Sequence, residues 1–412
     1  MENNNNNQKV VTRIITAVIP AYSDVSVVKN SVISLATQWI PVNSFFLEII
    51  IVDDNPSMDY SFFTSEAFGQ IMNPRVSIKI IKNAENYGQG VSRQIGIDNA
   101  TSNWVVLCDE DDMYATNALY RFWEILNEQY CGGDNGLPVA LIAAPVYCFD
   151  VNKERDVIRA QSIWVNGKLY NRQFLRDNEI RFPSGDNSRH AEDFPFIEML
   201  NYAIENNPNF KRVDFDETAD VFYYWMPNPQ SQSRRERFYT AMLTPLTMNA
   251  SLMIYDYMQR YNALNNIERD QDEFMKYKIA SISVYAYYAY VRWLYDMACG
   301  WRDDERFTEE VWEYYKDVMA RFKSELLCYW GEYCPSNIHE LHTQVKNSSD
   351  IRYIESWIEP FEEWINSGLK TLEMSYEEIK EYCGQLQFDK ADHEIHSSYV
   401  QSWCARNNKP CC

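Results

Sequence analysis

The feature that most limits the fold of this 412-residue chain is a regular alternation of short apolar runs and longer amphipathic stretches between Ile14 and about Tyr130. The apolar runs have the length of buried strands, and the stretches between them carry apolar residues at helical spacing. We expect strands over 14–19, 47–52, 76–81 and 104–108. Helices are expected over 27–38, 88–100 and 115–130. Such alternation is typical of βαβ units, so the chain is predicted to be an α/β protein with a mostly parallel, Rossmann-like sheet flanked by helices.

The remainder of the chain has a different pattern. A Gly-rich break over 131–138 is followed by strand-like runs over 139–148, 157–165 and about 214–226. After about residue 234, the stretches 238–264, 273–299 and 308–330 have helical periodicity and almost no turn residues. We therefore divide the chain into a disordered Asn-rich tail over 1–12, two halves of one α/β domain over 13–130 and 131–240, and an all-helical C-terminal region over 241–412.

Composition disfavours some classes of partner. The formal net charge of −21 argues against a broad electrostatic grip on nucleic acid or on anionic lipid. No apolar run reaches the roughly 20 residues that a membrane-spanning helix needs. The ten cysteines include no repeated CxxC pair, and nothing ahead of them resembles a signal peptide, so reduced cysteines and a cytoplasmic location are expected.

Three acidic clusters carry the candidate chemistry. Asp53-Asp54 and the run from Asp109 to Asp112 each follow a predicted strand, and Glu192-Asp193 opens a predicted helix. The carboxyl ends of parallel strands meet at the ligand-binding edge of a sheet. The order of these clusters therefore predicts a metal–nucleotide site with acid/base chemistry beside it.

Asp109 and Asp111 form a DxD pair. If the strand continues through them, its period of two puts both side chains on one face, with Glu110 and Asp112 on the other. One carboxylate could then hold a ribose hydroxyl while its neighbour ligates Mn²⁺ or Mg²⁺. The alternative is a solvated acidic turn in which Asp112 caps the next helix.

The other candidates also have structural alternatives. A carboxylate at Asp53-Asp54 could accept the imide N–H of uracil, or could bond its own turn backbone. Glu192-Asp193 could supply a general base, or could be charge placed favourably at a helix start. His190, just before that pair, could be a metal ligand, a base or a loop tether.

A glycine-containing loop precedes the helix expected at 88–100. In Asn86-Tyr87-Gly88-Gln89-Gly90 the glycines allow close backbone approach to a ligand, and Arg93, one turn into the helix, could reach a base carbonyl or a phosphate. The loop lacks the spacing of a Rossmann fingerprint or of a Walker loop.

Taken in order and spacing, these motifs resemble those of family 2 glycosyltransferases. The matching segments are Ile19-Pro20-Ala21-Tyr22, Glu48 to Asp54, Asn86-x-Gly88 with Ser92-Arg93, Leu107 to Asp112, Glu192-Asp193, and Tyr224 to Ser233. The resemblance covers about residues 13–240. It implies a GT-A fold and an inverting transfer of a sugar, usually from UDP, to an acceptor hydroxyl in glycan biosynthesis, with a divalent cation. On this view 13–130 binds the nucleotide sugar and 131–240 binds the acceptor.

The resemblance also implies residue roles. On the donor side, the base pocket would be lined by Pro20, Ala21 and Tyr22, with Asp54 and the adjacent Asp53 on the uracil. Arg93 would contact the base or ribose side, and Asp109 would bind ribose.

For the chemistry, the resemblance makes Asp111 the ligand of Mn²⁺ or Mg²⁺, with Asp109 as a second candidate ligand. Asp193 would be the base that deprotonates the acceptor, and Glu192 would support it. Arg234 or Arg235, on a closing loop, would stabilise the diphosphate.

Two positions depart from the usual family pattern. Position 110 is Glu where small residues are common, and Asn55-Pro56 stands where Gly-Ser is typical. Both departures could reshape the donor pocket.

Two rival functions and several partners stay open. A sugar-phosphate nucleotidyltransferase usually has a Gly-rich basic loop after its first strand, where this chain has Ala21-Tyr22-Ser23-Asp24. A catalytically inactive scaffold would keep binding without transfer. The acceptor could be a polysaccharide, a lipid-linked sugar, a protein side chain or a modified base, and the aromatic-rich helical region could form a homo-oligomer.

Overall fold

The computed structural model of the chain describes residues 14–131, 137–149, 155–158, 164–189, 191–215, 222–226, 237–267, 297, 301–325 and 370–385. Within it the chain forms two compact units, Met1–Asn228 and Pro229–Cys412. The finer boundaries predicted at residues 130 and 240 stay predictions.

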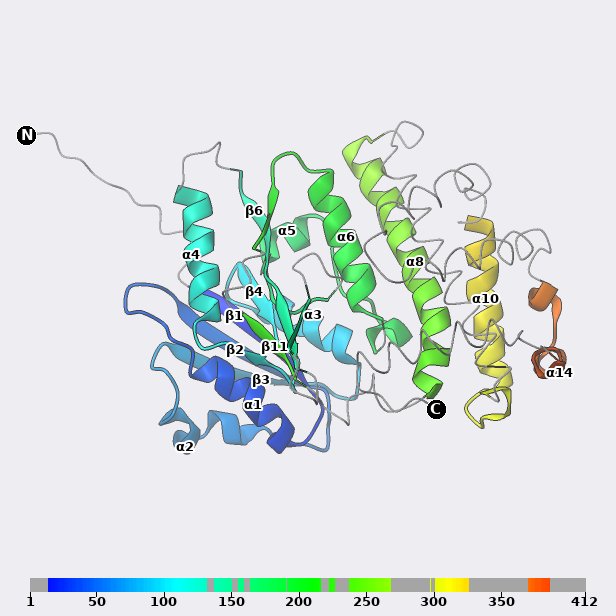
Figure 1. Cartoon of the computed structure of the whole chain (residues 1–412), viewed down its shortest axis with the longest axis horizontal. Helices are drawn as coiled ribbons and strands as arrows, with labels where there is room; N and C mark the ends of the chain where they lie inside the picture. Colours follow the sequence, from blue (N-terminus) through cyan, green and yellow to red (C-terminus); the bar gives the residue numbers. More distant parts are fainter. Residues whose placement is uncertain are drawn as a thin grey trace, which may run out of the picture. The chain divides into compact units, whose positions relative to one another are not determined.

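The first unit is built on a seven-stranded sheet with the order β10-β6-β9-β4-β1-β2-β3 (Figure 1). Four parallel strands form the centre and one edge of the sheet. They are β1 (Ile14–Ala21), β2 (Phe46–Asp53), β3 (Val76–Lys82) and β4 (Trp104–Leu107). The other three are β6 (Val139–Ala143), β9 (Lys168–Asn171) and β10 (Lys211–Asp214). Strand β9 is antiparallel to both β4 and β6, whereas β10 is parallel to β6. The predicted mostly parallel α/β sheet is confirmed.

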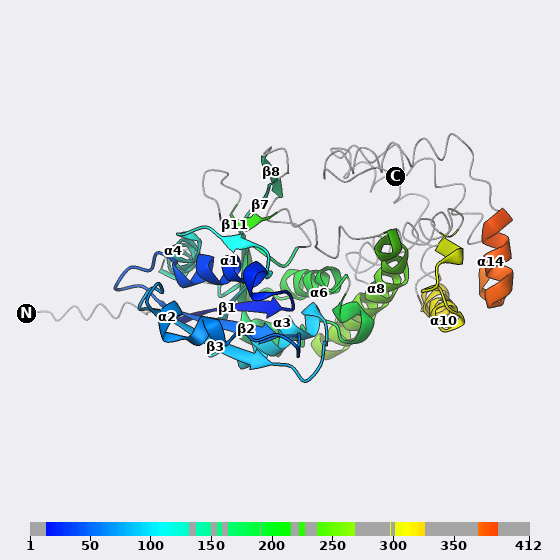
Figure 2. The ribbon, with the colours of Figure 1, turned by 90° about the horizontal axis from the view of Figure 1, so that it is seen from below.

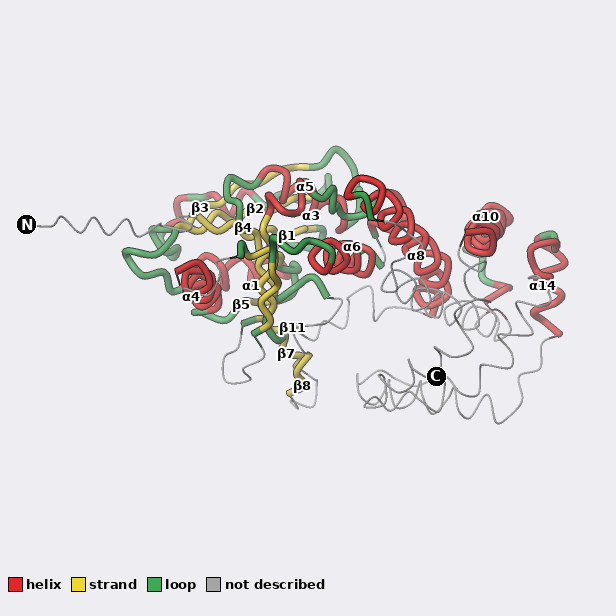
Figure 3. Tube along the Cα trace, turned by 90° about the horizontal axis from the view of Figure 1, so that it is seen from above, coloured by secondary structure: helices red, strands yellow, loops and turns green. Residues whose placement is uncertain are grey.

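Helices cover both faces of this sheet. They are α1 (Val25–Ala36), α2 (Glu66–Gly69), α3 (Gln89–Asn99), α4 (Ala118–Cys131), α5 (Arg172–Asp177) and α6 (Asp193–Glu205). Helices α1 and α4 lie on one side of the strands, and α3 and α5 lie on the other (Figures 2 and 3). The almost fully buried β1 and β2 are the apolar runs that a sheet covered on both faces requires.

Helix α3 approaches β1 closely, and a glycine makes this possible. A Cβ placed on Gly96 would lie 2.2 Å from Val18 Cγ1. A side chain at this position would push the helix off the sheet. Because Arg93 lies one turn earlier on α3, this close packing also fixes the depth at which its side chain enters the protein.

The strand register brings three loops to one edge. Ala21 at the end of β1 is level with Asp53 of β2, and Val18 pairs with Leu107 at the end of β4. The segments that follow β1, β2 and β4 therefore start side by side, as expected for the carboxyl edge of a parallel sheet.

A second, smaller sheet has the order β5-β11-β7-β8. Its strands are β5 (Met113–Tyr114), β11 (Tyr223–Trp225), β7 (Val146–Phe149) and β8 (Arg155–Ile158). The single strand expected over 139–148 is therefore wrong, because the chain leaves one sheet after β6 and enters the other at β7. The strand expected over 157–165 is confirmed only at 157–158, which lie in β8, and is wrong at 165, where residues 165–167 form a bend; residues 159–163 lie outside the described residues.

Every described element of the second unit is helical. These are α8 (Arg237–Asn265), η4 (Trp301–Asp303), α10 (Glu309–Glu325), η5 (Lys370–Glu373) and α14 (Tyr376–Gln385). Arg321 of α10 pairs with Asp256 of α8, and the buried Trp312 donates its indole N–H to the Met374 carbonyl at 3.0 Å. The expected helical C-terminal region is confirmed, and most of the helix expected over 273–299 lies outside the described residues. Among the described helices, none combines the length and apolar character that a membrane crossing requires.

Candidate active site

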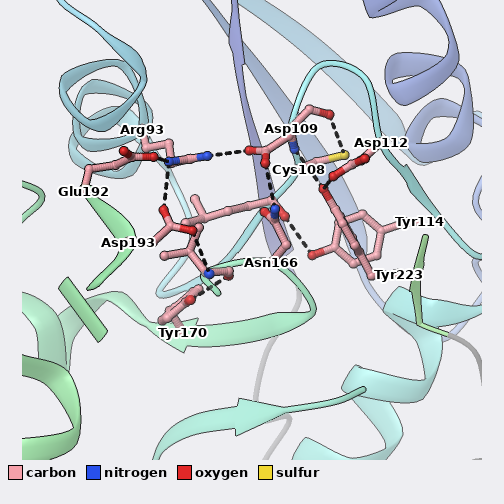
Figure 4. Close-up of polar contacts among 12 residues, drawn as sticks. Arg93, Cys108, Asp109, Asp112, Tyr114, Asn166, Tyr170, Glu192, Asp193 and Tyr223 are labelled. Carbon is pink, nitrogen blue, oxygen red and sulfur yellow. Dashed lines mark hydrogen bonds and ion pairs between the residues drawn. The ribbon is translucent and has the colours of Figure 1, made fainter. Parts of the chain in front are cut away.

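The centre of the site is Arg93, a residue 1% exposed whose side chain links three of the predicted acidic residues (Figure 4). Its Nη2 lies 2.5 Å from Asp109 Oδ1. Its Nη1 lies 2.6 Å from Glu192 Oε1 and 3.1 Å from Asp193 Oδ1. The acids of the second and third clusters, more than 80 residues apart in the chain, are thus joined by one guanidinium. A contact of Arg93 with the base or ribose stays a prediction, and the burial of this side chain among acids disfavours it.

The pKa values of Arg93 and Asp193 reflect one buried cation that faces three carboxylates. Burial alone lowers the pKa of Arg93, but attraction to Asp109, Asp193 and Glu192 outweighs burial and raises that pKa above its usual value. Burial raises the pKa of Asp193, and Glu192 and Asp109 raise it further against the opposing effect of Arg93. The Asp193 side chain remains 29% exposed, so a substrate hydroxyl can still reach it.

A short backbone segment, residues 164–166, contacts two of these acids. The Val165 N–H donates to Asp193 Oδ2 at 3.3 Å, and Asn166 Nδ2 donates to Asp109 Oδ2 at 2.8 Å. The segment therefore connects Asp109, in the turn after β4, with Asp193, the first residue of α6.

Strand β9 anchors this 164–166 segment from below. Tyr170 Oη donates to the Val165 carbonyl at 2.6 Å, and the buried Lys168 Nζ donates to the Trp164 carbonyl. Gly167, with φ of +70°, makes the turn between them, and a Cβ there would lie 2.8 Å from Val146 Cγ2. Sequence reasoning missed these residues because it assigned Val165 to a strand, although the Asn166-Gly167 dipeptide is a turn signal that could have located the segment.

The acidic run after β4 is a turn and does not continue the strand. Strand β4 ends at Leu107, and the Asp112 N–H donates to the Asp109 carbonyl at 3.2 Å. The predicted alternation of side chains on two strand faces is therefore wrong. Each acid instead has its own surroundings: Asp111 is partly exposed, and Glu110 bonds the backbone of the loop after β1.

Asp112 is fully buried and holds the small sheet to this turn. It accepts hydrogen bonds from Tyr223 Oη at 2.7 Å and from the Met226 N–H at 2.8 Å. The same Tyr223 hydroxyl accepts from the Asp109 N–H at 3.0 Å. The alternative of a solvated acidic turn in which Asp112 caps the next helix is excluded, because this carboxylate has no solvent exposure.

Asp54 orders the glycine-containing loop ahead of α3. Its carboxylate, 3% exposed, accepts from Asn83 Nδ2 and from the N–H groups of Tyr87 and Gly88, each at 2.8 Å. Gly88 has φ of +87°, and a Cβ there would lie 2.5 Å from Arg189 Cγ, so only glycine fits. The described contacts thus give Asp54 a structural role, and its contact with a uracil stays a prediction.

Asp53 fits its structural alternative. Its Oδ1 accepts from the Asn55 N–H at 3.0 Å, which is a turn aspartate bonding the backbone two residues on. Lys82 Nζ lies 3.6 Å from its Oδ2. Of the residues expected to line a base pocket, Pro20 and Ala21 are buried at the end of β1, and the Tyr22 side chain is 50% exposed.

The described residues contain no group of three or more His, Cys, Asp and Glu side chains arranged to hold a metal ion. His190, Arg234 and Arg235 lie outside the described residues. Both carboxylate oxygens of Asp109 accept hydrogen bonds, from Arg93 and from Asn166, whereas Asp111 is partly exposed at the same turn. A partly exposed carboxylate suits a Mg²⁺ or Mn²⁺ ion that takes its other ligands from substrate phosphates and water.

Comparison with known proteins gives a family match and distant relatives. Residues 16–188 match the model of "Glycosyl transferase family 2". The poly(ribitol-phosphate) beta-glucosyltransferase of Bacillus spizizenii is 26% identical over 245 residues, which is 55% of this chain and 35% of the relative. The chain thus spans about a third of the length of that relative.

Among solved structures, matches come from S. aureus TarS. The fragment 1–349 in complex with UDP-GlcNAc has 13% sequence identity and a TM-score of 0.46, over 75% of this chain and 91% of that chain. A longer TarS structure has 15% identity and a TM-score of 0.41, over 68% of this chain and 53% of that chain.

Proposed function

Because residues 16–188 belong to glycosyl transferase family 2, we propose that this chain is an inverting glycosyltransferase that moves a sugar from a nucleotide diphosphate to an acceptor hydroxyl. UDP is the proposed nucleotide. The observation that carries the proposal is the bridging of Asp109, Glu192 and Asp193 by the single guanidinium of Arg93. This bridge supports a single site in which Asp109, on the donor side, and Asp193, the proposed base, are held at a fixed separation.

Asp193 is the proposed general base. Partial burial and neighbouring acids raise its pKa, which strengthens it as a proton acceptor, and its remaining exposure leaves room for a hydroxyl. It would remove the acceptor proton as the acceptor oxygen attacks the anomeric carbon from the face opposite the leaving UDP. The Val165 N–H and Arg93 Nη1 bond different oxygens of Asp193 and orient it.

Asp111 is the proposed ligand of Mn²⁺ or Mg²⁺, and the bound cation would neutralise charge that develops on the leaving diphosphate. Asp109 has its carboxylate fixed by Arg93 and Asn166, which suits a group that orients the ribose of the donor. Three carboxylates surround the single positive charge of Arg93, so the site has an excess of negative charge. A bound cation would reduce the repulsion between these carboxylates and the diphosphate of the donor.

For the acceptor we propose a hydroxyl of a glycan or polyol-phosphate polymer. The support is the relative named for acting on poly(ribitol-phosphate). That relative is 26% identical over part of each chain, so it guides which acceptor to test first. It does not indicate which sugar is transferred.

The test is UDP release by the full chain from a set of UDP-sugars with Mn²⁺ or Mg²⁺, with and without a polyol-phosphate acceptor. Asp193→Asn should lower transfer by about 10²- to 10⁴-fold while UDP still binds. Asp98→Asn, which removes a carboxylate from an exposed pair with Arg181, is the control. UDP binding without turnover of any nucleotide sugar would favour the inactive scaffold, and full transfer by Asp193→Asn would remove Asp193 from the mechanism.

A further inference from the structure

The two positions at which the chain departs from the usual family pattern, Glu110 and Asn55, converge on one dipeptide. That dipeptide is Tyr22-Ser23, which directly follows β1. Glu110 comes from the turn after β4 and Asn55 from the loop after β2, so three separate loops meet at this point.

Glu110 bonds the dipeptide with both carboxylate oxygens. Its Oε2 accepts from the Tyr22 N–H at 2.7 Å and from the Ser23 N–H at 2.9 Å. Its Oε1 accepts from Ser23 Oγ at 2.5 Å. Charge-assisted bonds to a carboxylate are stronger than bonds between neutral groups, so this is the firmest of the contacts that hold the dipeptide.

Two neutral side chains bond the carbonyl groups. Asn55 Nδ2 donates to the Tyr22 carbonyl at 2.8 Å, and Tyr60 Oη donates to the Ser23 carbonyl at 2.5 Å. Asn55 is itself fixed, because its Oδ1 accepts from the Ser57 N–H at 3.1 Å.

Every backbone donor and acceptor of Tyr22-Ser23 is therefore bonded by a side chain from elsewhere in the unit. A loop is normally free to rearrange because its polar groups are bonded to water. Here the backbone is fixed before any ligand arrives, while the Tyr22 side chain remains half exposed. A ligand that contacts this segment need not supply the free energy of ordering it.

We propose that Glu110 and Asn55 are positioning residues that preorganise Tyr22-Ser23 to receive the nucleoside part of the donor, and that they set donor affinity without taking part in the transfer step. The inference rests on the proposed function, because it takes a nucleoside diphosphate as the ligand of this edge. Glu110 links this segment to the turn that carries Asp109 and Asp111, so nucleoside and diphosphate would be held by one connected structure.

The experiment measures UDP affinity by calorimetry and donor KM by UDP release for Glu110→Ala, Asn55→Ala and the double variant, in the full chain. We expect the UDP Kd and donor KM to rise about 10-fold for Glu110→Ala, with kcat changed by less than about twofold. Asn55→Ala should give a smaller rise of the same kind. Glu110→Gln should be intermediate, because its amide oxygen can accept from the backbone while its NH₂ donates to Ser23 Oγ.

The chain offers matched controls for both variants. Glu48 Oε2 accepts from Thr101 N, Thr101 Oγ1 and Thr16 Oγ1, which is the same kind of carboxylate anchor. Asn73 accepts from the Arg75 N–H and donates to the Gln38 carbonyl, which repeats the bonding of Asn55. Glu48→Ala and Asn73→Ala should leave the UDP Kd unchanged.

Two other roles for Glu110 predict different results. If its charge alone mattered, removing a carboxylate beside an anionic diphosphate would tighten UDP binding. If Glu110 were a metal ligand, the Mn²⁺ concentration for half-maximal UDP binding would rise even with UDP at the same multiple of each variant's Kd, whereas positioning leaves it unchanged under that condition. Tighter binding, a shifted Mn²⁺ requirement, or a Kd equal to that of wild type would each overturn the inference.

Hydrogen exchange separates this inference from the proposed function. The amides of Tyr22 and Ser23 should exchange faster in Glu110→Ala, with or without ligand, while amides of β3 keep their rates. Wild-type protein that binds no UDP and transfers no sugar would overturn the proposed function, and with it the donor role of Tyr22-Ser23, even if exchange showed the segment to be held. Unchanged exchange in Glu110→Ala would overturn the positioning role alone.

Discussion

Arg93 Nη2 and Asp109 Oδ1 lie 2.5 Å apart, and the opposite nitrogen of the same guanidinium bonds Glu192 and Asp193. Arg93 therefore fixes the distance between the turn after β4 and the start of α6. Since Arg93 is itself held by the close packing of α3 on β1, this distance is set by the sheet and does not depend on flexible loops.

Replacing Arg93 by Met should destabilise the first unit by about 3–5 kcal/mol, because the variant leaves the buried Glu192 and the partly buried Asp109 and Asp193 without their cation. The measurement is native-state hydrogen exchange of β1 and β2 amides in increasing urea. Arg181→Met is the control, since its pair with Asp98 at 2.6 Å is exposed and should contribute less than about 1 kcal/mol. Equal effects of the two variants would contradict a structural role for Arg93.

Replacing Tyr170 by Phe should lower kcat about 10- to 100-fold and leave the UDP Kd unchanged. The variant removes only the hydroxyl that bonds the Val165 carbonyl, so Asp193 loses part of its alignment, and small misplacements of a catalytic group reduce rates strongly. The ring can still pack against Phe196, whose centroid is 5.7 Å away.

The control for this variant is Tyr376→Phe, which deletes a hydroxyl that bonds the Phe307 carbonyl in the other unit. Steady-state transfer assays and calorimetry give the two quantities. A change in UDP affinity without a change in kcat would mean that the 164–166 segment acts on donor binding and does not align Asp193.

Lys168 should make stability depend on pH. Burial lowers the pKa of this fully buried amine to about 7, with Arg212 adding to the effect and Asp193 and Asp214 opposing it. Because the unfolded chain holds this proton up to about pH 10.4, the unfolded state binds more protons than the folded state between these values. The unfolding free energy contributed by Lys168 therefore rises with pH in this window.

The measurable consequence is a difference between wild type and Lys168→Met. Their difference in unfolding free energy should grow in favour of wild type by up to about 1.4 kcal/mol per pH unit from pH 7 to pH 9. Hydrogen exchange of β9 amides at matched urea concentrations at several pH values gives this slope. A flat or falling difference would show that the amine is not neutralised on folding.

The central strands were predictable because their burial on both faces leaves continuous apolar runs. Their carboxyl ends could be located to within two residues, and this was enough to bring Asp54 and Asp109 to one edge. The same signal failed at 139–148, where a continuous apolar run is shared by β6 and β7 in different sheets. Periodicity cannot reveal a change of sheet when both halves are buried.

Side-chain roles were harder to predict than backbone elements. Glu110 was expected on the strand face opposite Asp109, because the sequence does not mark where β4 stops and a turn begins. Arg93 was assigned to a ligand, although its partners Glu192 and Asp193 are about 100 residues away and meet it only through the packing of α3. Long-range partners of long side chains depend on tertiary packing, which local pattern does not encode.

The loops at the carboxyl edge of the sheet owe their shapes to one another. Glu110 shapes the loop after β1, Asp54 shapes the loop after β3, and Ser188 Oγ accepts the Val91 N–H at the start of α3. In a chimaera, a loop transplanted from a homologue would arrive without the neighbouring loop whose side chain holds it, and would lose its native conformation. Re-engineering of substrate preference in this scaffold should therefore exchange interlocked loops as sets, and natural divergence at this edge is expected to proceed by paired substitutions.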